Sequence, residues 1–307
     1  MSRHIVNIDS PRCYVGCKRK QLICRADNQE KSIPLEDVAA IVITSFSATL
    51  HSELLIEAAN HGVALVLCRD FKPASLVLPA NRSSDTLLTK AALSLPKKTV
   101  SSLWRKTLDA KCQNQLTLAE RIEPEHDKLE GMRRVASRQS LDKESSTARF
   151  YWRVFSDSIH DRSFLRDPEG GGANDLLNYG YAVLLSLVLQ KLFAVGLDPT
   201  LGIYHKVRER SAPLAYDLME PFRPCVDWRV MLWLRNKVGF QDYRITAEFR
   251  RWVSEFTLDR VGYFGIEMEL QHCIESVIRS FRKAVLNQQI RHYKPWTLQN
   301  TKWAGWL

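Results

Sequence analysis

Several familiar kinds of site are missing from this chain of 307 residues. It contains neither G-x-x-x-x-G-K-[ST] nor G-x-G-x-x-G, so no motif indicates a nucleotide-hydrolysing or dinucleotide-binding site. H-E-x-x-H and G-x-S-x-G are absent as well, which leaves no motif for a zinc peptidase or a serine hydrolase. The glycines 170–172 do not follow a predicted strand, and we interpret them as a flexible connector between two helices.

Long apolar runs are missing too. Crossing a bilayer takes about 18 or more apolar residues, and the best candidate, 181–197, is interrupted by Gln190 and Lys191. We interpret this stretch as a buried core helix. The N-terminus includes Arg3 and Asp9 and so lacks the continuous apolar segment of a secretory signal. The chain is therefore expected to be cytoplasmic, with its seven cysteines as reduced thiols.

Three of these cysteines, Cys13, Cys17 and Cys24, lie close together in the sequence. A zinc site is one interpretation, but no fourth Cys or His follows at finger-like spacing. We favour the interpretation that they are small buried hydrophobic residues.

Positive charge is in excess. The 44 Lys and Arg residues outnumber the 34 Asp and Glu residues and give a net charge of +10. Hydrophobic residues make up 45% and charged residues 25%, which is typical of a folded protein. The charge favours a polyanionic partner, with nucleic acid first and an anionic membrane surface second, although it could serve solubility alone.

The apolar pattern changes near residue 80. Before it, short segments rich in β-branched residues predict strands around one helix, 52–62. The predicted strands are 4–8, 21–24, 38–43, 63–67 and 74–78. Turn formers fill 79–85, and helical spacing of apolar residues prevails beyond them. We predict an α+β fold with a small β-rich, sandwich-like domain followed by a larger all-α domain. The predicted bounds are 1–80 for the β-rich domain, 81–96 for a linker and entry helix, and 97–307 for the helical domain.

A histidine in the helical half stands in a dense group of charges. His205 is followed by Lys206, Arg208 and Arg210, a concentration of positive charge suited to phosphates. A lone histidine is more often a packed or surface residue than a ligand or catalyst. The surrounding residues therefore decide how it is interpreted.

Two acids follow this histidine. Asp217 and Glu220 are three residues apart, so they share a face if the segment is helical. Pro221 and Pro224 lack the N–H group that a continuing helix needs. We therefore expect the helix to kink or restart just after Glu220, which places a carboxylate at a bend.

Several motifs, taken in order, resemble those of one known family, and the likeness covers nearly the whole chain. The motifs are IPLEDV at 33–38, KCQNQ at 111–115, NDLLNYGYAVL at 174–184, GIYH at 202–205 and DLMEPFRP at 217–224, with Asp227 completing the last. Together they resemble the CRISPR-associated integrase and endonuclease family Cas1. The sequence of 217–224 is most like that of members from type II systems.

The resemblance implies a metal site for Mg²⁺ or Mn²⁺ made of Glu144, His205 and Glu220, which are also the implied catalytic residues. Family members often carry a glycine shortly after the first acid, whereas this chain has serines at 145–146, and Asp142 is the nearest substitute. Two carboxylates and a neutral imidazole suit a hard divalent cation and leave positions for water or phosphate oxygens.

Further residues have expected supporting roles. Asp217 matches an accessory acid, Asn178 a polar position near the site, and Arg223 is expected to pair with an acid or to face a phosphate. Asn178 has a structural alternative, in which it holds helices together. Basic residues of the helical half are expected to contact DNA. They are Lys206, Arg208, Arg235, Arg250 and Arg251.

The function that the resemblance implies is insertion of short DNA duplexes (protospacers) into a CRISPR array of a prokaryote, as part of antiviral defence. A DNA 3′-hydroxyl would attack a phosphodiester, and one such bond would break as another forms. The implied assembly is a homodimer through the β-rich domains, with a small Cas2 partner bridging two dimers. The alternatives are a non-catalytic basic scaffold for DNA and a branched-DNA nuclease of repair. The tail from 292, which mixes basic and aromatic residues, is expected to dock on its own domain or a partner rather than stack on DNA.

Overall fold

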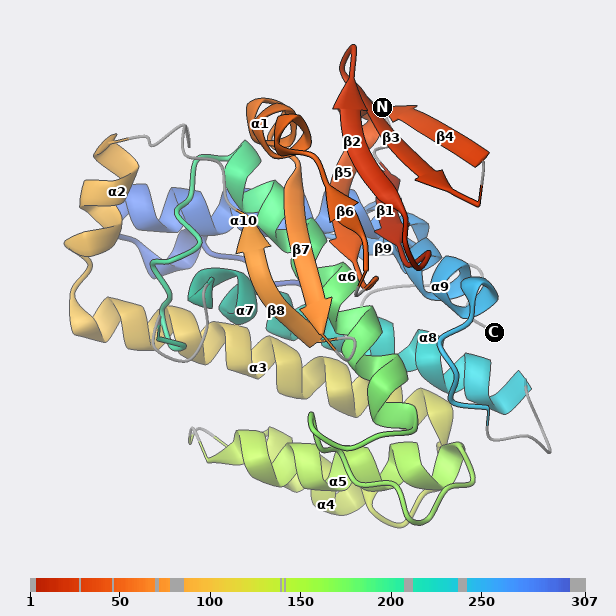
Figure 1. Cartoon of the computed structure of the whole chain (residues 1–307). Helices are drawn as coiled ribbons and strands as arrows, with labels where there is room; N and C mark the ends of the chain where they lie inside the picture. The colour runs from red at the N-terminus through yellow and green to blue at the C-terminus, as the bar shows by residue number, and fades with distance from the viewer. Residues whose placement is uncertain are drawn as a thin grey trace.

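The computed structural model groups the strands of the N-terminal part together beside α6 (Ala173–Ala194), and the rest of the described chain is mainly helical (Figure 1). It describes residues 4–27, 29–45, 47–69, 72–77, 86–138, 140, 142–206, 212–236 and 242–298. A strand-rich N-terminal part followed by a helical part is the predicted α+β architecture, which is thereby confirmed.

Two four-stranded sheets form the N-terminal part. The first has the order β1 (His4–Ile8), β5 (Val38–Ile43), β7 (Ala64–Arg69) and β8 (Lys72–Val77), with only β8 antiparallel to its neighbour. The second has the order β4 (Gln29–Pro34), β3 (Gln21–Ala26), β2 (Tyr14–Lys18) and β6 (Thr49–Leu50). Apolar side chains of both sheets share one core with helix α1 (Ser52–Asn60), which agrees with the sandwich-like expectation.

Strand β5 explains how the two parts of the chain are joined. Its residues alternate between two cores, because successive side chains of a strand point to opposite faces. Ile41 and Ile43 belong to the core shared by the two sheets, whereas Ala40 and Val42 belong to the core of the helical part. The first sheet is therefore covered on both faces, as its nearly uninterrupted apolar strands require.

Among the described residues, the helical part contains α2 to α10 and three short 3₁₀ turns, and a fourth such turn lies in the N-terminal part. The helices are α2 (Thr86–Leu93), α3 (Lys97–Ile122), α4 (Leu129–Ala136), α5 (Lys143–Ser158), α6 (Ala173–Ala194), α7 (Pro213–Met219), α8 (Arg223–Asn236), α9 (Ala247–Ser254) and α10 (Leu270–Asn287). The 3₁₀ turns are η1 (Leu35–Asp37), which lies in the N-terminal part, η2 (Glu220–Phe222), η3 (Glu255–Leu258) and η4 (Ile290–His292). An antiparallel hairpin of β9 (Arg260–Tyr263) and β10 (Ile266–Glu269) interrupts the helices and adds strand structure that the sequence did not predict.

Helix α6 is the centre of this part and packs against the first sheet and against α7, α8 and α10. It is long and apolar enough to cross a membrane, yet 94% of its most apolar window is buried in the fold. The prediction of a buried core helix is therefore confirmed for 181–194, whereas 195–197 lie beyond the end of the helix. Lys191, which interrupts the apolar run, is buried and pairs with Glu275.

Polar contacts also hold the N-terminal part to the helical part. Asp9 forms an ion pair with Arg250 of α9, and the Asn7 side chain donates to the Ser254 hydroxyl. The division at 1–80, 81–96 and 97–307 stays a prediction, since the two parts share buried surface.

Candidate active site

The α-helical path is interrupted where the second acid of the predicted triad lies. Helix α7 ends at Met219, the 3₁₀ turn η2 begins at Glu220, and α8 restarts at Arg223. Pro221 lies inside this break and Pro224 is the second residue of α8, and neither can donate the backbone hydrogen bond of a continuing helix. The predicted break after Glu220 is confirmed, and it turns this carboxylate toward α3.

Lys111 of α3 joins two of the predicted ligands. Its Nζ lies 2.6 Å from Glu144 Oε1, at the start of α5, and 2.7 Å from Glu220 Oε2. The lysine side chain is only 12% exposed. The two carboxylate oxygens thus lie within two ion-pair lengths of each other, and one ammonium group neutralises both.

The charges around Glu220 keep it ionised. Burial alone would raise its pKa, but Arg223 and Lys111 outweigh burial and lower the pKa to about 2. Arg223 Nε donates to Glu220 Oε1 at 3.0 Å, so the expectation that Arg223 pairs with an acid is met. Burial likewise opposes the charge of Lys111, and Glu220 and Glu144 outweigh it and raise the lysine pKa.

His205 is held by Asp217, which is fully buried. Asp217 Oδ1 lies 2.7 Å from His205 Nδ1, and Oδ2 accepts the backbone N–H groups of Ile203 at 2.6 Å and Tyr204 at 3.1 Å. An ionised carboxylate at Nδ1 places the imidazole proton there, which leaves the Nε2 lone pair available to a cation. Asp217 therefore sets both the orientation and the tautomer of the histidine.

Gly202 makes this close approach of the loop feasible. A Cβ atom at this position would lie 2.6 Å from the carbonyl oxygen of His205 and 2.7 Å from Pro213 Cβ. Only glycine avoids both contacts without a shift of the backbone.

The residues present fit a hard divalent cation in kind. Two ionised carboxylates and an imidazole with a free lone pair are donors that Mg²⁺ and Mn²⁺ accept. Glu220 Oε2 is buried and accepts no hydrogen bond of good geometry. Its contact with Lys111 is an ion pair. Within the described residues, no three His, Cys, Asp or Glu side chains lie at metal-binding distances from one another. Because Lys111 Nζ is in ion-pair contact with both Glu144 and Glu220, a cation bound by these two carboxylates must displace the Lys111 ammonium group.

An open cleft of about 570 Å³ adjoins these groups. Its lining includes Lys111, Glu144, Arg166, Tyr181, Tyr204 and Arg223. Sequence analysis missed two of these cations. Lys111 could have been found from the KCQNQ motif that contains it, whereas Arg166 lies in a loop without any motif.

Asn178 contacts Arg166, which lines the cleft. Its Oδ1 accepts from Arg166 Nη2 at 2.9 Å, and its Nδ2 donates to the carbonyl oxygen of Pro168 at 3.0 Å. The predicted proximity of Asn178 to the site is thus indirect, through Arg166. The alternative prediction was that Asn178 holds helices together. In the structure it fastens a loop, rather than a second helix, to α6.

Asp227 of α8 is buried and contacts Tyr181, which lines the cleft. Tyr151 donates to it at 2.7 Å, and the Tyr181 hydroxyl donates to its other oxygen. Burial raises the Asp227 pKa to about 6, even though the two hydroxyl donors act to lower it. Tyr181, whose ring lies 4.6 Å below the Arg223 guanidinium, is therefore fixed at both its edge and its face.

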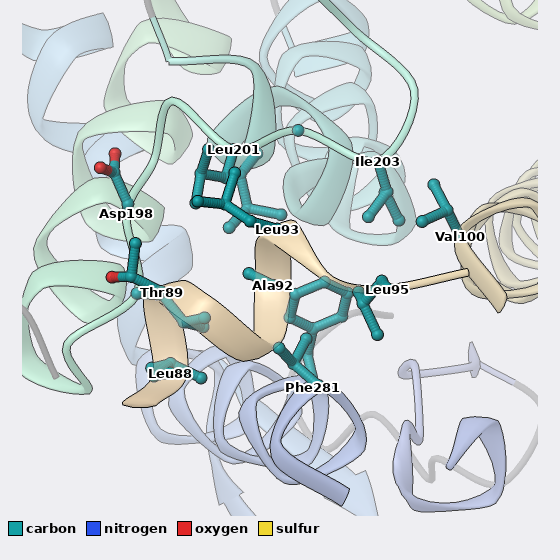
Figure 2. A pocket seen from close by; sticks show the side chains of 14 residues that line it. Leu88, Thr89, Ala92, Leu93, Leu95, Val100, Asp198, Leu201, Ile203 and Phe281 are labelled. Carbon is teal, nitrogen blue, oxygen red and sulfur yellow. The ribbon is translucent and has the colours of Figure 1, made fainter. Parts of the chain in front are cut away.

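A second cavity is lined in part by the segment that leads to His205. Figure 2 shows apolar side chains of α2, α10 and this segment turned toward one another around it, with Asp198 at its edge. Its volume is about 220 Å³, and Leu88, Leu95, Leu201 and Phe281 are among its lining residues. It offers an apolar space without grouped catalytic side chains, so we assign the chemistry to the cleft at Lys111.

The residues predicted to contact DNA differ in their surroundings. Lys206, Arg235 and Arg251 are exposed, although Arg235 lies 3.8 Å from Glu123. Arg250 pairs with Asp9 and donates to the carbonyl oxygen of Ile245, which favours a structural role over DNA contact. Arg208 lies outside the described residues.

The first half of the tail docks on its own helical part, as expected. Tyr293, Trp296 and Leu298 are buried, whereas Trp303 and Trp306 lie outside the described residues. Asn114 of α3 donates to the carbonyl oxygens of Trp296 and Pro221 and accepts from the N–H of Leu298. The same asparagine thus fastens both the tail and the turn that carries Glu220.

A strand-rich part joined to a helical part, with a histidine and two carboxylates beside a basic cleft, is typical of enzymes that act on nucleic acid phosphates. A family model described as CRISPR associated protein Cas1 matches residues 6–259. The chain therefore belongs to the CRISPR-associated Cas1 family, and the resemblance noted in its motifs is confirmed.

Curated relatives and solved structures agree with this membership. The chain is 27% identical to the CRISPR-associated endonuclease Cas1 of Neisseria meningitidis over 292 residues, which is 91% of each chain. It is 24% identical to the CRISPR-associated endonuclease Cas1 1 of Francisella tularensis subsp. novicida, over 96% of this chain and 98% of that one. Its fold is similar to that of a casposase bound to an integration product, with a TM-score of 0.74, 21% identity, and coverage of 98% and 96%. A Cas1 protein from Thermotoga maritima has a TM-score of 0.71 at 15% identity, with coverage of 92% and 97%. A chain of a Cas6-RT-Cas1–Cas2 complex has a TM-score of 0.77 at 18% identity, covering 96% of this chain and 36% of that one.

Proposed function

We propose that this Cas1 family protein is a metal-dependent DNA endonuclease and integrase that inserts short DNA duplexes into a CRISPR array. A DNA 3′-hydroxyl attacks a phosphodiester of the array, and the new bond replaces the broken one. No nucleotide cofactor is needed, which agrees with the missing phosphate-loop motif. The place of action is the cytoplasm of a prokaryote.

One observation supports this proposal more than any other. Glu144 and Glu220 meet at a single ammonium group, and His205, whose Nδ1 is held by Asp217, directly follows Tyr204, which lines the same cleft as Glu144. Paired carboxylates that need a cation between them are a natural binding site for Mg²⁺ or Mn²⁺. We assign Glu144, His205 and Glu220 as the ligands.

The residues of the chain have separate tasks in this proposal. Asp217 holds the His205 proton at Nδ1 and so keeps Nε2 ready to bind. Arg223 and Arg166, which line the cleft, bind phosphate oxygens of DNA and orient the strand. When bound, the divalent ion supplies a Lewis acid that makes a 3′-hydroxyl more acidic and offsets charge on the attacked phosphate.

The proposed partners are DNA with 3′-hydroxyl ends, the repeat DNA of the array, a second copy of this chain and a small Cas2 protein. The solved structures of similar fold include a Cas6-RT-Cas1–Cas2 complex and a casposase bound to its integration product, which supports the Cas2 and DNA assignments. A homodimer through the β-rich parts supplies two active sites, one for each end of the inserted duplex.

The test is a joining assay in Mn²⁺. A labelled short duplex with free 3′-hydroxyls is incubated with a supercoiled plasmid that carries the repeat, with and without the Cas2 partner. We expect labelled plasmid with the unaltered protein and at least about 100-fold less with Glu220→Gln, because the loss of a cation ligand costs several kcal/mol of transition-state stabilisation.

Glu275→Gln is the matched control. Glu275 is also a carboxylate held between a lysine and an arginine, Lys191 and Arg279, but it lies on α10 away from the cleft. It should join DNA normally. Equal product from Glu220→Gln and the unaltered protein contradicts the assigned site. DNA binding without product indicates a scaffold, and cleavage of branched DNA without joining indicates a repair nuclease.

A further inference from the structure

Three lysines from α3, α10 and the segment after α10 lie near one another. The backbone N–H of Lys294 donates to the Ser280 hydroxyl of α10 at 3.0 Å. Lys283 follows Ser280 by three residues, so it lies on the same face of that helix. Lys106 of α3 donates from Nζ to the carbonyl oxygen of Tyr293, the residue before Lys294, at 2.8 Å. Packing of the segment against both helices therefore gathers the three charges.

Two further basic side chains of this segment are held by a single amide group. Gln289 Oε1 accepts from Arg291 Nε at 3.1 Å and lies 3.0 Å from His292 Nε2. Both side chains thus have defined positions beside the lysines. We name the five residues together the α10 basic patch, which consists of Lys106, Lys283, Arg291, His292 and Lys294.

The positive charge of this patch is not neutralised by acids. Within the part of the chain that the structure describes, none of the five residues forms an ion pair with Asp or Glu, and Lys283, Arg291 and Lys294 are exposed. Burial and then these three cations lower the pKa of His292. One turn earlier on α10, by contrast, Arg279 pairs with Glu275. A surface that concentrates charge of one sign without compensation is suited to a polyanion.

The patch lies outside the cleft but close to it. Among the described residues, the lining of the cleft includes no member of the patch. Lys106 precedes Lys111 by five residues on α3, which is about 7.5 Å along the helix axis. Duplex DNA carries a phosphate charge about every 1.7 Å along its axis. A duplex that lies on the patch can therefore also reach the cleft.

The proposed reaction needs two DNA duplexes at once. The inserted strand ends at the cleft, whereas the attacked strand of the array continues past the reacting phosphate and needs contacts beyond the cleft. We propose that the α10 basic patch binds backbone phosphates of the array duplex, the DNA that is attacked. This inference rests on the proposed function and adds a separate surface for the second DNA. Cations contact phosphates whatever the bases are, so the patch holds this duplex without reading its sequence.

The test measures binding in EDTA, so that no joining occurs. The probe is a relaxed, covalently closed plasmid, which has no strand end to enter the cleft. The triple variant Lys283→Gln, Arg291→Gln, Lys294→Gln removes three exposed charges and should bind the plasmid at least about tenfold more weakly. The slope of log affinity against log salt should become shallower by about 2.7, that is about 0.9 for each lost phosphate contact.

The triple variant Lys18→Gln, Arg19→Gln, Lys20→Gln is the matched control. It removes the same number of exposed charges from the turn between β2 and β3, and it should bind the plasmid as the unaltered protein does. An equal loss in both triple variants would come from net charge alone and overturns the patch. Unchanged plasmid binding by the patch variant overturns it as well and leaves an acidic protein as the partner of this surface.

A second experiment distinguishes the two DNA duplexes. A labelled short duplex with 3′-hydroxyl ends is bound to saturation, and the closed plasmid is then added. The unaltered protein should bind the plasmid without releasing the short duplex, and the patch variant should keep the short duplex but bind the plasmid weakly. Release of the short duplex by the plasmid overturns the assignment to array DNA, and so does an equal loss of affinity for both probes.

The joining assay separates this inference from the proposed function. If both DNA molecules bind together but no joining follows in Mn²⁺, the patch stands and the proposed function fails. If the patch variant joins DNA with an unchanged KM for the plasmid, the proposed function stands and the patch is wrong.

Discussion

Replacement of Lys111 by methionine removes the ammonium group between the two carboxylates and keeps most of the side-chain volume. Lys111 Nζ lies 2.6 Å from Glu144 and 2.7 Å from Glu220. Without it, two carboxylate oxygens that lie at most about 5 Å apart repel each other by at least about 3 kcal/mol at an effective dielectric constant of about 20. Arg223 stays paired with Glu220 and offsets part of this repulsion.

Stability without metal and affinity for Mn²⁺ are expected to change in opposite directions. In the absence of metal, the variant should lose about 2 kcal/mol of unfolding free energy, and its Tm should fall by about 4 °C. Because Mn²⁺ no longer has to displace a lysine, its Kd should fall by about 30-fold, which is the same 2 kcal/mol expressed as affinity. Added Mn²⁺ should therefore raise the Tm of the variant more than that of the unaltered protein.

Thermal unfolding with and without Mn²⁺, together with titration calorimetry, measures both quantities. Lys191→Met is the control, because Lys191 is a buried lysine paired with one carboxylate, Glu275, away from the cleft. It should lose stability and leave the Mn²⁺ affinity unchanged. Unchanged or weaker Mn²⁺ binding in Lys111→Met would refute the reasoning that the ammonium group stands in the place of the cation.

Three further substitutions test the surroundings of the site. Asp217→Asn should weaken Mn²⁺ binding and DNA joining about 10- to 100-fold, because His205 loses the partner that sets its tautomer, and calorimetry showing unchanged Mn²⁺ affinity would contradict this. Asp227, whose pKa burial raises to about 6, stays protonated in the folded state while the unfolded chain ionises. Stability should therefore fall by about 3 kcal/mol as pH rises from about 4 to 6. In Asp227→Asn that fall should vanish in urea titrations across this range, whereas an identical pH profile would rule out a raised pKa. Asn114→Ala should cost about 3 kcal/mol through lost hydrogen bonds and should speed amide exchange at Leu298, and normal protection there would show that the tail docks without it.

Local patterns predicted the elements whose side chains alternate clearly. The strand at 38–43 has the predicted bounds as β5, and the helix predicted from Ser52 begins there as α1. The residue before it, His51, caps this helix, since its side chain accepts the free backbone N–H of Glu53. Strand β4 was missed because Gln29–Pro34 is mostly polar and exposed. It is held by backbone pairing with β3, which no side-chain pattern reveals.

The candidate site was predicted in part for a similar reason. The interruption of the helix could be predicted from residues 217–224 alone, because proline affects the backbone locally. The family resemblance also implied Glu144, His205 and Glu220, and their role as metal ligands stays a prediction. No sequence pattern indicated that Lys111 would lie between two of them, since that depends on how α3 passes α5 and η2.

The sequence by itself determined that an N-terminal part rich in strands is followed by a helical part, that the helix is interrupted at Glu220, and which family the protein belongs to. Only the tertiary structure decided which charges meet. Arg250 looked like a DNA contact and instead pairs with Asp9 from the other end of the chain, whereas Lys111 looked unremarkable and neutralises two acids. Periodicity and backbone sterics act over a few residues, but an ion pair depends on segments brought together by the whole packed core.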